Sequence, residues 1–199
     1  GASLEMQLLD LASLESVRDF VARYGQTDRP PLRALVCNAG LQFVGERPHT
    51  VDGFEPTFQI NHLSHFLLAH LLLDHLRAPG QIVFLGSSTH DPDAHSGLPH
   101  PRFIKAEWIA RPALDPDPPA DTLRDAGRRA YATSKLCNVM TALEFDHGFQ
   151  ESGRSGVRAY VYDPGMMPGS GLARTYAGYE RLFWRFVFPV MRLWDRGVT

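Results

Sequence analysis

The chain has 199 residues, of which 44% are hydrophobic and 21% are charged, a composition typical of one globular domain. Its formal net charge of −2 excludes the basic field on which nucleic-acid binding usually depends. Two cysteines far apart in sequence, Cys37 and Cys137, favour a reduced, cytoplasmic setting over a disulfide framework. The first residues lack the pattern of a signal peptide, and we expect a single soluble domain over residues 1–199.

Strand-like and helix-like patterns alternate along the chain. In order, the predicted elements are a strand at 4–10, a helix at about 13–24, a strand at 32–40, a helix at about 54–77, a strand at 81–88, a polar excursion at about 89–127, a helix at about 129–150 and a strand at 156–165. This alternation predicts an α/β fold with a parallel sheet covered by helices on both faces.

Small and polar residues follow three of the predicted strands. They are Asn38-Ala39-Gly40, Ser87-Ser88-Thr89 and Asp163-Pro164-Gly165. Ligands of open parallel sheets bind beyond the carboxyl ends of the strands, so we expect the functional site at these three turns.

Tyr131 and Lys135 lie four positions apart in the predicted helix at 129–150, which places both on one helical face. An ammonium near a phenol favours the phenolate, by about 4 kcal/mol for charges at contact distance in a partly polar environment. This attraction would lower the pKa of the tyrosine towards neutrality, as general acid–base chemistry on a carbonyl or alcohol requires. A serine on an adjacent strand end, Ser88, could orient the same oxygen.

Five motifs together resemble the short-chain dehydrogenase/reductase family. They are "NAG" at 38–40, "NHLSHFLL" at 61–68, "GSS" at 86–88, "YATSK" at 131–135 and "DPG" at 163–165. The resemblance implies a Rossmann-like, doubly wound parallel sheet in a three-layer α/β/α arrangement, incomplete at both ends. Within the family the chain is most similar to the branch that contains retinol dehydrogenases and light-dependent protochlorophyllide reductases.

The resemblance also implies a set of site residues. The catalytic residues would be Ser88, Tyr131, Lys135 and Asn61, with Tyr131 as the proton donor, Lys135 on the nicotinamide ribose and Asn61 sustaining a proton relay through a water. Whether Ser88 or Thr89 orients the substrate is left open. The residues lining the cofactor would be Asp10, Leu11, Asn38, Ala39, Gly40, Pro164 and Gly165, besides Tyr131 and Lys135. NADP(H) is favoured over NAD(H) as the cofactor.

The function implied is NAD(P)H-dependent reduction of a carbonyl or conjugated double bond, or oxidation of an alcohol, on a bulky apolar substrate. The alternative is a non-catalytic binding module on the same fold. Its support is the lack of the family's glycine-rich phosphate loop, which leads us to expect a truncated chain. Similar glycine spacing at Gly165, Gly169 and Gly171 follows the last predicted strand, and we do not expect it to bind phosphate.

Two further features have structural explanations. His62 and His65 share a helical face, but no carboxylate or thiolate accompanies them, so we expect core or surface histidines and no metal site. The aromatic tail "RLFWRFVFPVMRLW" suits a lid over an apolar substrate, with peripheral membrane contact left open as the alternative.

Overall fold

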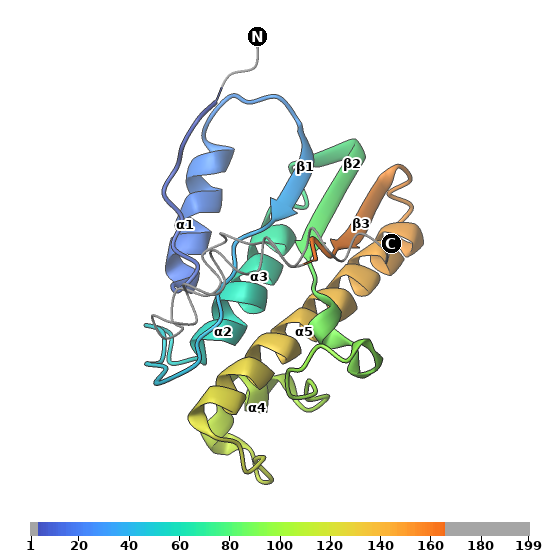
Figure 1. Cartoon of the computed structure of the whole chain (residues 1–199). Helices are drawn as coiled ribbons and strands as arrows, with labels where there is room; N and C mark the ends of the chain where they lie inside the picture. The colour runs from blue at the N-terminus through green and yellow to red at the C-terminus, as the bar shows by residue number, and fades with distance from the viewer. Residues whose placement is uncertain (1–3, 166–199) are drawn as a thin grey trace, which may run out of the picture.

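A parallel three-stranded sheet organises the computed structural model, which describes residues 4–165. The strands are β1 (Leu32–Cys37), β2 (Leu76–Leu85) and β3 (Val157–Tyr162), in the order β1-β2-β3 (Figure 1). Cys37 pairs with Phe84, and Leu85 pairs with Tyr162, so all three carboxyl ends meet at one edge. The predicted parallel α/β fold is confirmed, but within residues 4–165 the helices cover one face of the sheet, whereas the sequence predicted that both are covered.

Helices connect the strands, and three of the α-helices begin with a side-chain cap. They are α1 (Leu14–Gly25), α2 (Pro56–Phe58), a π-helical turn (Gln59–Leu63), α3 (Ser64–Leu71), α4 (Ala106–Ala110) and α5 (Leu123–Glu151). Short 3-10 turns occupy Ser88–His90, Pro92–Ala94 and Pro112–Leu114. The Ser13 hydroxyl accepts a hydrogen bond from the Ser16 amide at the start of α1, as the sequence predicted.

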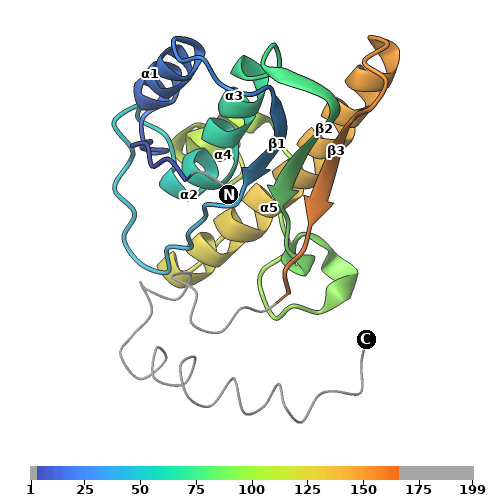
Figure 2. The ribbon, with the colours of Figure 1, turned by 90° about the horizontal axis from the view of Figure 1, so that it is seen from above.

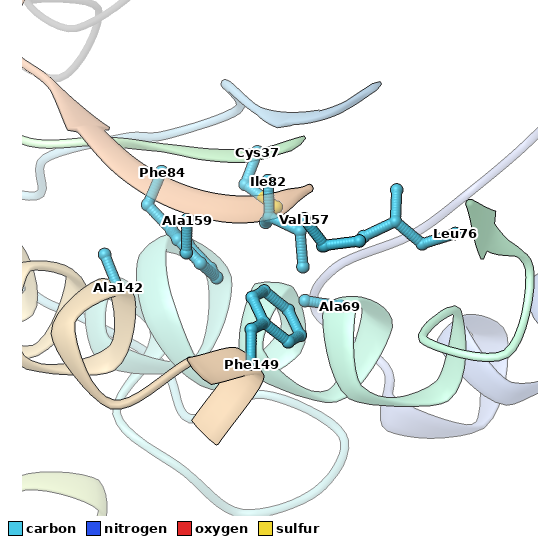
Figure 3. Packing of buried hydrophobic residues seen from close by; sticks show 9 residues of the cluster. All are labelled: Cys37, Ala69, Leu76, Ile82, Phe84, Ala142, Phe149, Val157 and Ala159. Carbon is cyan, nitrogen blue, oxygen red and sulfur yellow. The ribbon is translucent and has the colours of Figure 1, made fainter. Parts of the chain in front are cut away.

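The core lies between the sheet and the helices α3 and α5, which cover one of its faces (Figure 2). Nine buried residues form it: Cys37, Ala69, Leu76, Ile82, Phe84, Ala142, Phe149, Val157 and Ala159 (Figure 3). Helix α1 packs beside α3 through a second cluster, Val17, Leu68 and Leu72. On the other face of the sheet, Val36 and Tyr160 are 57% and 45% exposed.

The predicted strand at 4–10 is wrong. These residues form no strand, and Leu4, Met6 and Leu8 are almost fully exposed. A strand needs a neighbour for its backbone hydrogen bonds, and the described residues provide none beside this segment. It is attached instead by two arginines: Arg23 donates to the Leu8 carbonyl, and Arg29 pairs with Glu5 at 2.6 Å.

Three other boundaries differ from the sequence-based expectation. The helix predicted at 54–77 runs from Pro56 to Leu71 and contains the π-helical turn. The strand after it begins at Leu76 rather than residue 81, because Leu76 pairs with Leu32 across an irregularity that accommodates Pro79. Helix α5 begins at Leu123, inside the predicted excursion, where the Thr122 hydroxyl accepts a hydrogen bond from the Asp125 amide.

The loop after β1 approaches α5 so closely that only glycine fits at the contact. A Cβ atom added to Gly127 would lie 1.9 Å from the Phe43 carbonyl oxygen and 2.9 Å from its carbon. The same loop holds the backbone of Leu41 against Asn61. Gly127 therefore lets the loop that carries residues 38–40 settle against the helix that carries Tyr131.

We predict that Gly127→Ala destabilises the protein by about 1–3 kcal/mol, because a backbone carbonyl must move to admit the methyl group. Gly148 lies in the same helix with nothing within 4 Å of an added Cβ. Gly148→Ala is therefore the control, and it should stabilise the protein by about 0.5–1 kcal/mol through helix propensity. Urea unfolding of both variants makes the measurement. Equal or greater stability of Gly127→Ala than of the wild type would show that the contact is not as close as described.

Candidate functional site

The carboxyl edge of the sheet gathers the three strand-end turns expected from the sequence. Residues 38–40 follow β1, residues 86–88 follow β2 and residues 163–165 follow β3 (Figure 1). Parallel pairing in register places these turns side by side, at the edge where ligands of such sheets bind.

Helix α5 brings Tyr131 and Lys135 to this edge on one face. Both side chains are buried, with 7% and 5% of their surfaces exposed. The Lys135 Nζ atom lies 5.4 Å from the centre of the Tyr131 ring and donates a hydrogen bond of 2.9 Å to the Leu85 carbonyl. Leu85 is the last residue of β2, so this bond fixes the lysine to the end of the central strand.

Burial changes the acid–base properties of Lys135. Desolvation lowers the pKa of its ammonium from 10.5 to about 8, against the opposing attraction of the Asp163 carboxylate. At pH 7 the group therefore remains mostly charged. An ammonium has three donors, and within residues 4–165 the one hydrogen bond that it makes is to Leu85. Two donors are left for hydroxyl groups of a ligand.

Asn61 lies on the π-helical turn and joins the same centre. Its side chain accepts from the Leu41 amide at 2.8 Å, and donates to the Leu41 carbonyl at 2.9 Å and to the Ser134 hydroxyl at 3.1 Å. A Cβ atom at Gly40 would lie 3.4 Å from Asn61 Oδ1 and 3.8 Å from Lys135 Nζ. The strand-end turn, Asn61 and Lys135 are thus close neighbours, as the sequence predicted. Single-turn π-helices are frequent at functional sites.

The hydroxyl groups after β2 differ in their surroundings. Ser88 is exposed, and its carbonyl accepts from the Asp91 amide. The Thr89 hydroxyl is buried, and no hydrogen-bond partner for it is found in the part of the chain that the structure describes. A buried hydroxyl without a partner is rare in proteins and is suited to a ligand. Whether Ser88 or Thr89 orients the substrate stays a prediction.

The remaining residues predicted to bind cofactor lie around this edge. Asn38, Ala39 and Gly165 are exposed, while Gly40 and Pro164 are partly buried. Asp10 is exposed, and its carboxylate accepts from the Ala12 amide ahead of α1. The Leu11 carbonyl accepts a hydrogen bond of 2.7 Å from Ser64. Their role towards a cofactor stays a prediction.

One buried residue of the site was missed. Asn138 is 1% exposed and donates to the carbonyls of Leu85 and Asn61, at 3.0 and 3.2 Å. The signal was present in the sequence, because Asn138 lies seven positions after Tyr131 and three after Lys135, on the same helical stripe.

The two histidines of the long helix are hydrogen-bonded, with His65 buried and His62 partly buried. His62 Nδ1 lies 3.1 Å from Asn138 Oδ1, and His65 Nδ1 lies 3.1 Å from the Asn61 carbonyl. Burial lowers the pKa of each to about 4, so both are neutral at pH 7. Among residues 4–165, no three histidine, cysteine or acidic side chains gather as metal ligands.

The two cysteines are not reactive groups of the site. Burial raises the pKa of Cys37 to about 12 and that of Cys137 to about 11, which leaves both as unreactive thiols. The aromatic tail, Gly169 and Gly171 lie outside the described residues. No helix within residues 4–165 has the length and apolar character needed to cross a membrane.

Comparisons of the sequence relate the chain to one family of known proteins. The family model for short chain dehydrogenases matches residues 1–96. A protochlorophyllide reductase of carrot, Daucus carota, is 34% identical over 178 residues, covering 84% of this chain and 44% of its own length. A short-chain dehydrogenase of Talaromyces variabilis is 32% identical over 222 residues, covering 95% of this chain and 60% of its own length. The chain thus spans about half the length of the relatives it matches.

Solved structures share the fold. An uncharacterised protein of Mycobacterium paratuberculosis superposes with a TM-score of 0.60 and 29% identity, covering 84% of this chain and 52% of that one. A short chain dehydrogenase of Salmonella enterica superposes with a TM-score of 0.55 and 21% identity, covering 94% of this chain and 65% of that one. Several relatives are named as chloroplastic, so the compartment of this protein stays a prediction. By its motifs, fold and relatives, the chain belongs to the short-chain dehydrogenase family of oxidoreductases.

Proposed function

We propose that the protein is an NADP(H)-dependent oxidoreductase that reduces a carbonyl or a conjugated double bond of a bulky apolar substrate, or runs the reverse oxidation. The observation that carries this proposal is the buried pair of Tyr131 and Lys135 at the carboxyl edge of the sheet, with the lysine bonded to Leu85. Tyr131 is the proposed proton donor in the direction of reduction.

Lys135 has two tasks in this proposal. Its charge favours the phenolate of Tyr131, so that the tyrosine can release its proton to the substrate oxygen or carbon. Its two spare donors fit a pair of ribose hydroxyls, which are acceptors of the matching kind. Keeping a charged lysine in a buried position is unfavourable, and this cost is understandable if the charge is used in the reaction.

The hydrogen-bond donors of this edge suit the cofactor. A Cβ atom added to Gly40 would lie 3.8 Å from Lys135 Nζ, so residues 38–40 would border the nicotinamide ribose bound to the lysine. Pro164 and Gly165, at the end of β3, would lie against the nicotinamide ring. When bound, NADP(H) supplies or accepts the hydride. NADP(H) is favoured over NAD(H) by one structural neighbour, BdcA, which was solved in complex with NADPH.

The bulky apolar substrate is proposed from the relatives. Most of those compared are named protochlorophyllide reductases, at 33–36% identity. The excursion between β2 and α5 borders the proposed site and offers apolar surface, since Phe103 is 80% exposed. The rival function, a binding module without catalysis, has no need of a charged lysine buried beside a tyrosine, and the site does not favour it.

We predict that Tyr131→Phe lowers the turnover number by at least about 100-fold, because a positioned general acid contributes roughly 10²–10⁴-fold to the rate. Cofactor binding should persist, since the ring and Lys135 remain. Oxidation of NADPH with an apolar carbonyl substrate gives the rate, and calorimetric titration gives the affinity. Tyr160→Phe, an exposed tyrosine on β3, is the matched control. Activity of Tyr131→Phe within tenfold of the wild type would exclude Tyr131 as the proton donor.

The two hydroxyls after β2 give a second test. We predict that Thr89→Val reduces kcat/KM for the carbonyl substrate more than Ser88→Ala, because the Thr89 hydroxyl is the one that is buried without a partner. The expected loss is about 10–100-fold, corresponding to one strong hydrogen bond made to the reacting oxygen. A larger loss in Ser88→Ala would assign substrate orientation to Ser88 instead.

The cost of burying Lys135 predicts a dependence of stability on pH. Its pKa is about 8 when folded and 10.5 when exposed, so the cost is fully present below pH 8 and disappears above pH 10.5. We expect Lys135→Met to be inactive yet more stable than the wild type at pH 7, by roughly 1–3 kcal/mol after the lost hydrogen bond is considered. Urea unfolding should show this gap shrinking at pH 10. If the variant is less stable than the wild type by the same free energy of unfolding at pH 7 and pH 10, burial does not lower the pKa of Lys135.

A further inference from the structure

We propose that Asn138, oriented by His62, is a positioning residue that holds the carbonyls of Leu85 and Asn61 where the site needs them. This inference rests on the proposed function for its effect on catalysis, but its structural part can be tested without any activity. Asn138 acts through the two carbonyls to which it is bonded.

The first element of the argument is a shared acceptor. The Leu85 carbonyl accepts from Lys135 Nζ at 2.9 Å and from Asn138 Nδ2 at 3.0 Å. A carbonyl oxygen has two lone pairs, so these two donors saturate it and define its direction. Because the lysine makes this bond alone within the described residues, the position of its ammonium depends on that carbonyl.

The second element is the bond from Asn138 to the π-helical turn. The amide nitrogen also donates to the Asn61 carbonyl at 3.2 Å, and this oxygen accepts from His65 Nδ1 at 3.1 Å as well. Through one buried side chain, α5 is therefore joined to the end of β2 and to the turn that carries Asn61. A shift in either carbonyl would move two of the proposed site residues together.

The third element fixes the orientation of the amide. Since Asn138 Nδ2 donates to two carbonyls, its oxygen must face His62 Nδ1, 3.1 Å away. An oxygen cannot donate, so His62 carries its proton on Nδ1. A pKa of about 4 keeps the ring neutral at pH 7, so Nδ1 carries its single N–H proton. Rotation of the amide would place its oxygen against both carbonyl oxygens, and His62 prevents this.

The kinetic test uses a small set of variants. Asn138→Leu keeps the volume but removes the amide, and we expect it to lower kcat about 100-fold, the loss typical of a site displaced by about 1 Å. His62→Leu should cost about tenfold, because the amide keeps its bonds but loses its orienting donor. His62→Asn offers an NH donor near the position of Nδ1 and should recover most of that loss. His70→Leu, the same substitution at an exposed position of α3, is the control and should retain wild-type activity.

The double variant separates positioning from independent contributions. If His62 acts through Asn138, His62→Leu added to Asn138→Leu should cause no further loss of kcat. If the double variant loses kcat by the product of the two single losses, His62 does not act through Asn138. Failure of His62→Asn to recover activity would also overturn the proposed relation between these residues.

A spectroscopic test avoids activity altogether. Leu85–Gly86 is the one Leu–Gly pair in the 199-residue sequence, so labelling with carbonyl-¹³C leucine and ¹⁵N glycine gives a single coupled NMR signal from the Leu85 carbonyl. Loss of a hydrogen bond should move this signal upfield in Asn138→Leu and, by less, in His62→Leu. His62→Asn and His70→Leu should leave it near the wild-type position.

The two tests distinguish the possible failures. An unchanged Leu85 signal in Asn138→Leu and His62→Leu would overturn the positioning proposal even if the protein is an active reductase. If the Leu85 signal shifts as expected but the protein reduces no carbonyl, the positioning role of Asn138 stands and the proposed function is overturned. If Asn138→Leu does not fold, His62→Leu and His62→Asn still test the positioning proposal. Within this network His62 bonds only to the Asn138 amide oxygen, so these variants change the orientation of that amide.

Discussion

The Leu85 carbonyl holds a charged lysine inside the protein, and the arrangement of the site follows from that one hydrogen bond. The bond joins α5 to the end of β2, and Asn138 on the same helix shares its acceptor. Parallel pairing of the three strands then places residues 38–40 and 163–165 on either side of the lysine. A different position of Leu85 would separate Lys135 from Asn61, Gly40 and Asp163.

The surrounding polar residues make this burial tolerable. Asn61, Ser134, Asn138 and His65 are all at most 3% exposed, and each has a hydrogen-bond partner. Buried polar networks of this kind rigidify a site when every member is satisfied. The Thr89 hydroxyl and two donors of Lys135 are left over, and they lie at the edge where a ligand would bind. These spare groups are the ones that we propose for binding a polar ligand.

Local pattern predicted the sheet, the helices and the residues that meet at the site. Ser13 as a cap, Tyr131 and Lys135 on one face, and Asn61 beside them all follow from spacing or motif. The prediction of a strand at 4–10 was wrong, because an alternation of apolar residues does not indicate whether a neighbouring strand is present. The start of β2 at Leu76 depends on long-range pairing with Leu32, and Asn138 depends on a carbonyl more than fifty residues away in sequence. Such tertiary contacts leave no periodic signal.

We propose that the charge of Lys135 holds the nicotinamide ribose. Calorimetric titration with reduced nicotinamide mononucleotide tests this, because that molecule carries only the half of the cofactor that these residues would hold. We expect binding at pH 7 and an affinity about tenfold lower at pH 9, because a lysine with a pKa of about 8 is then mostly neutral. Equal affinities at the two pH values, or no binding at either, would contradict it.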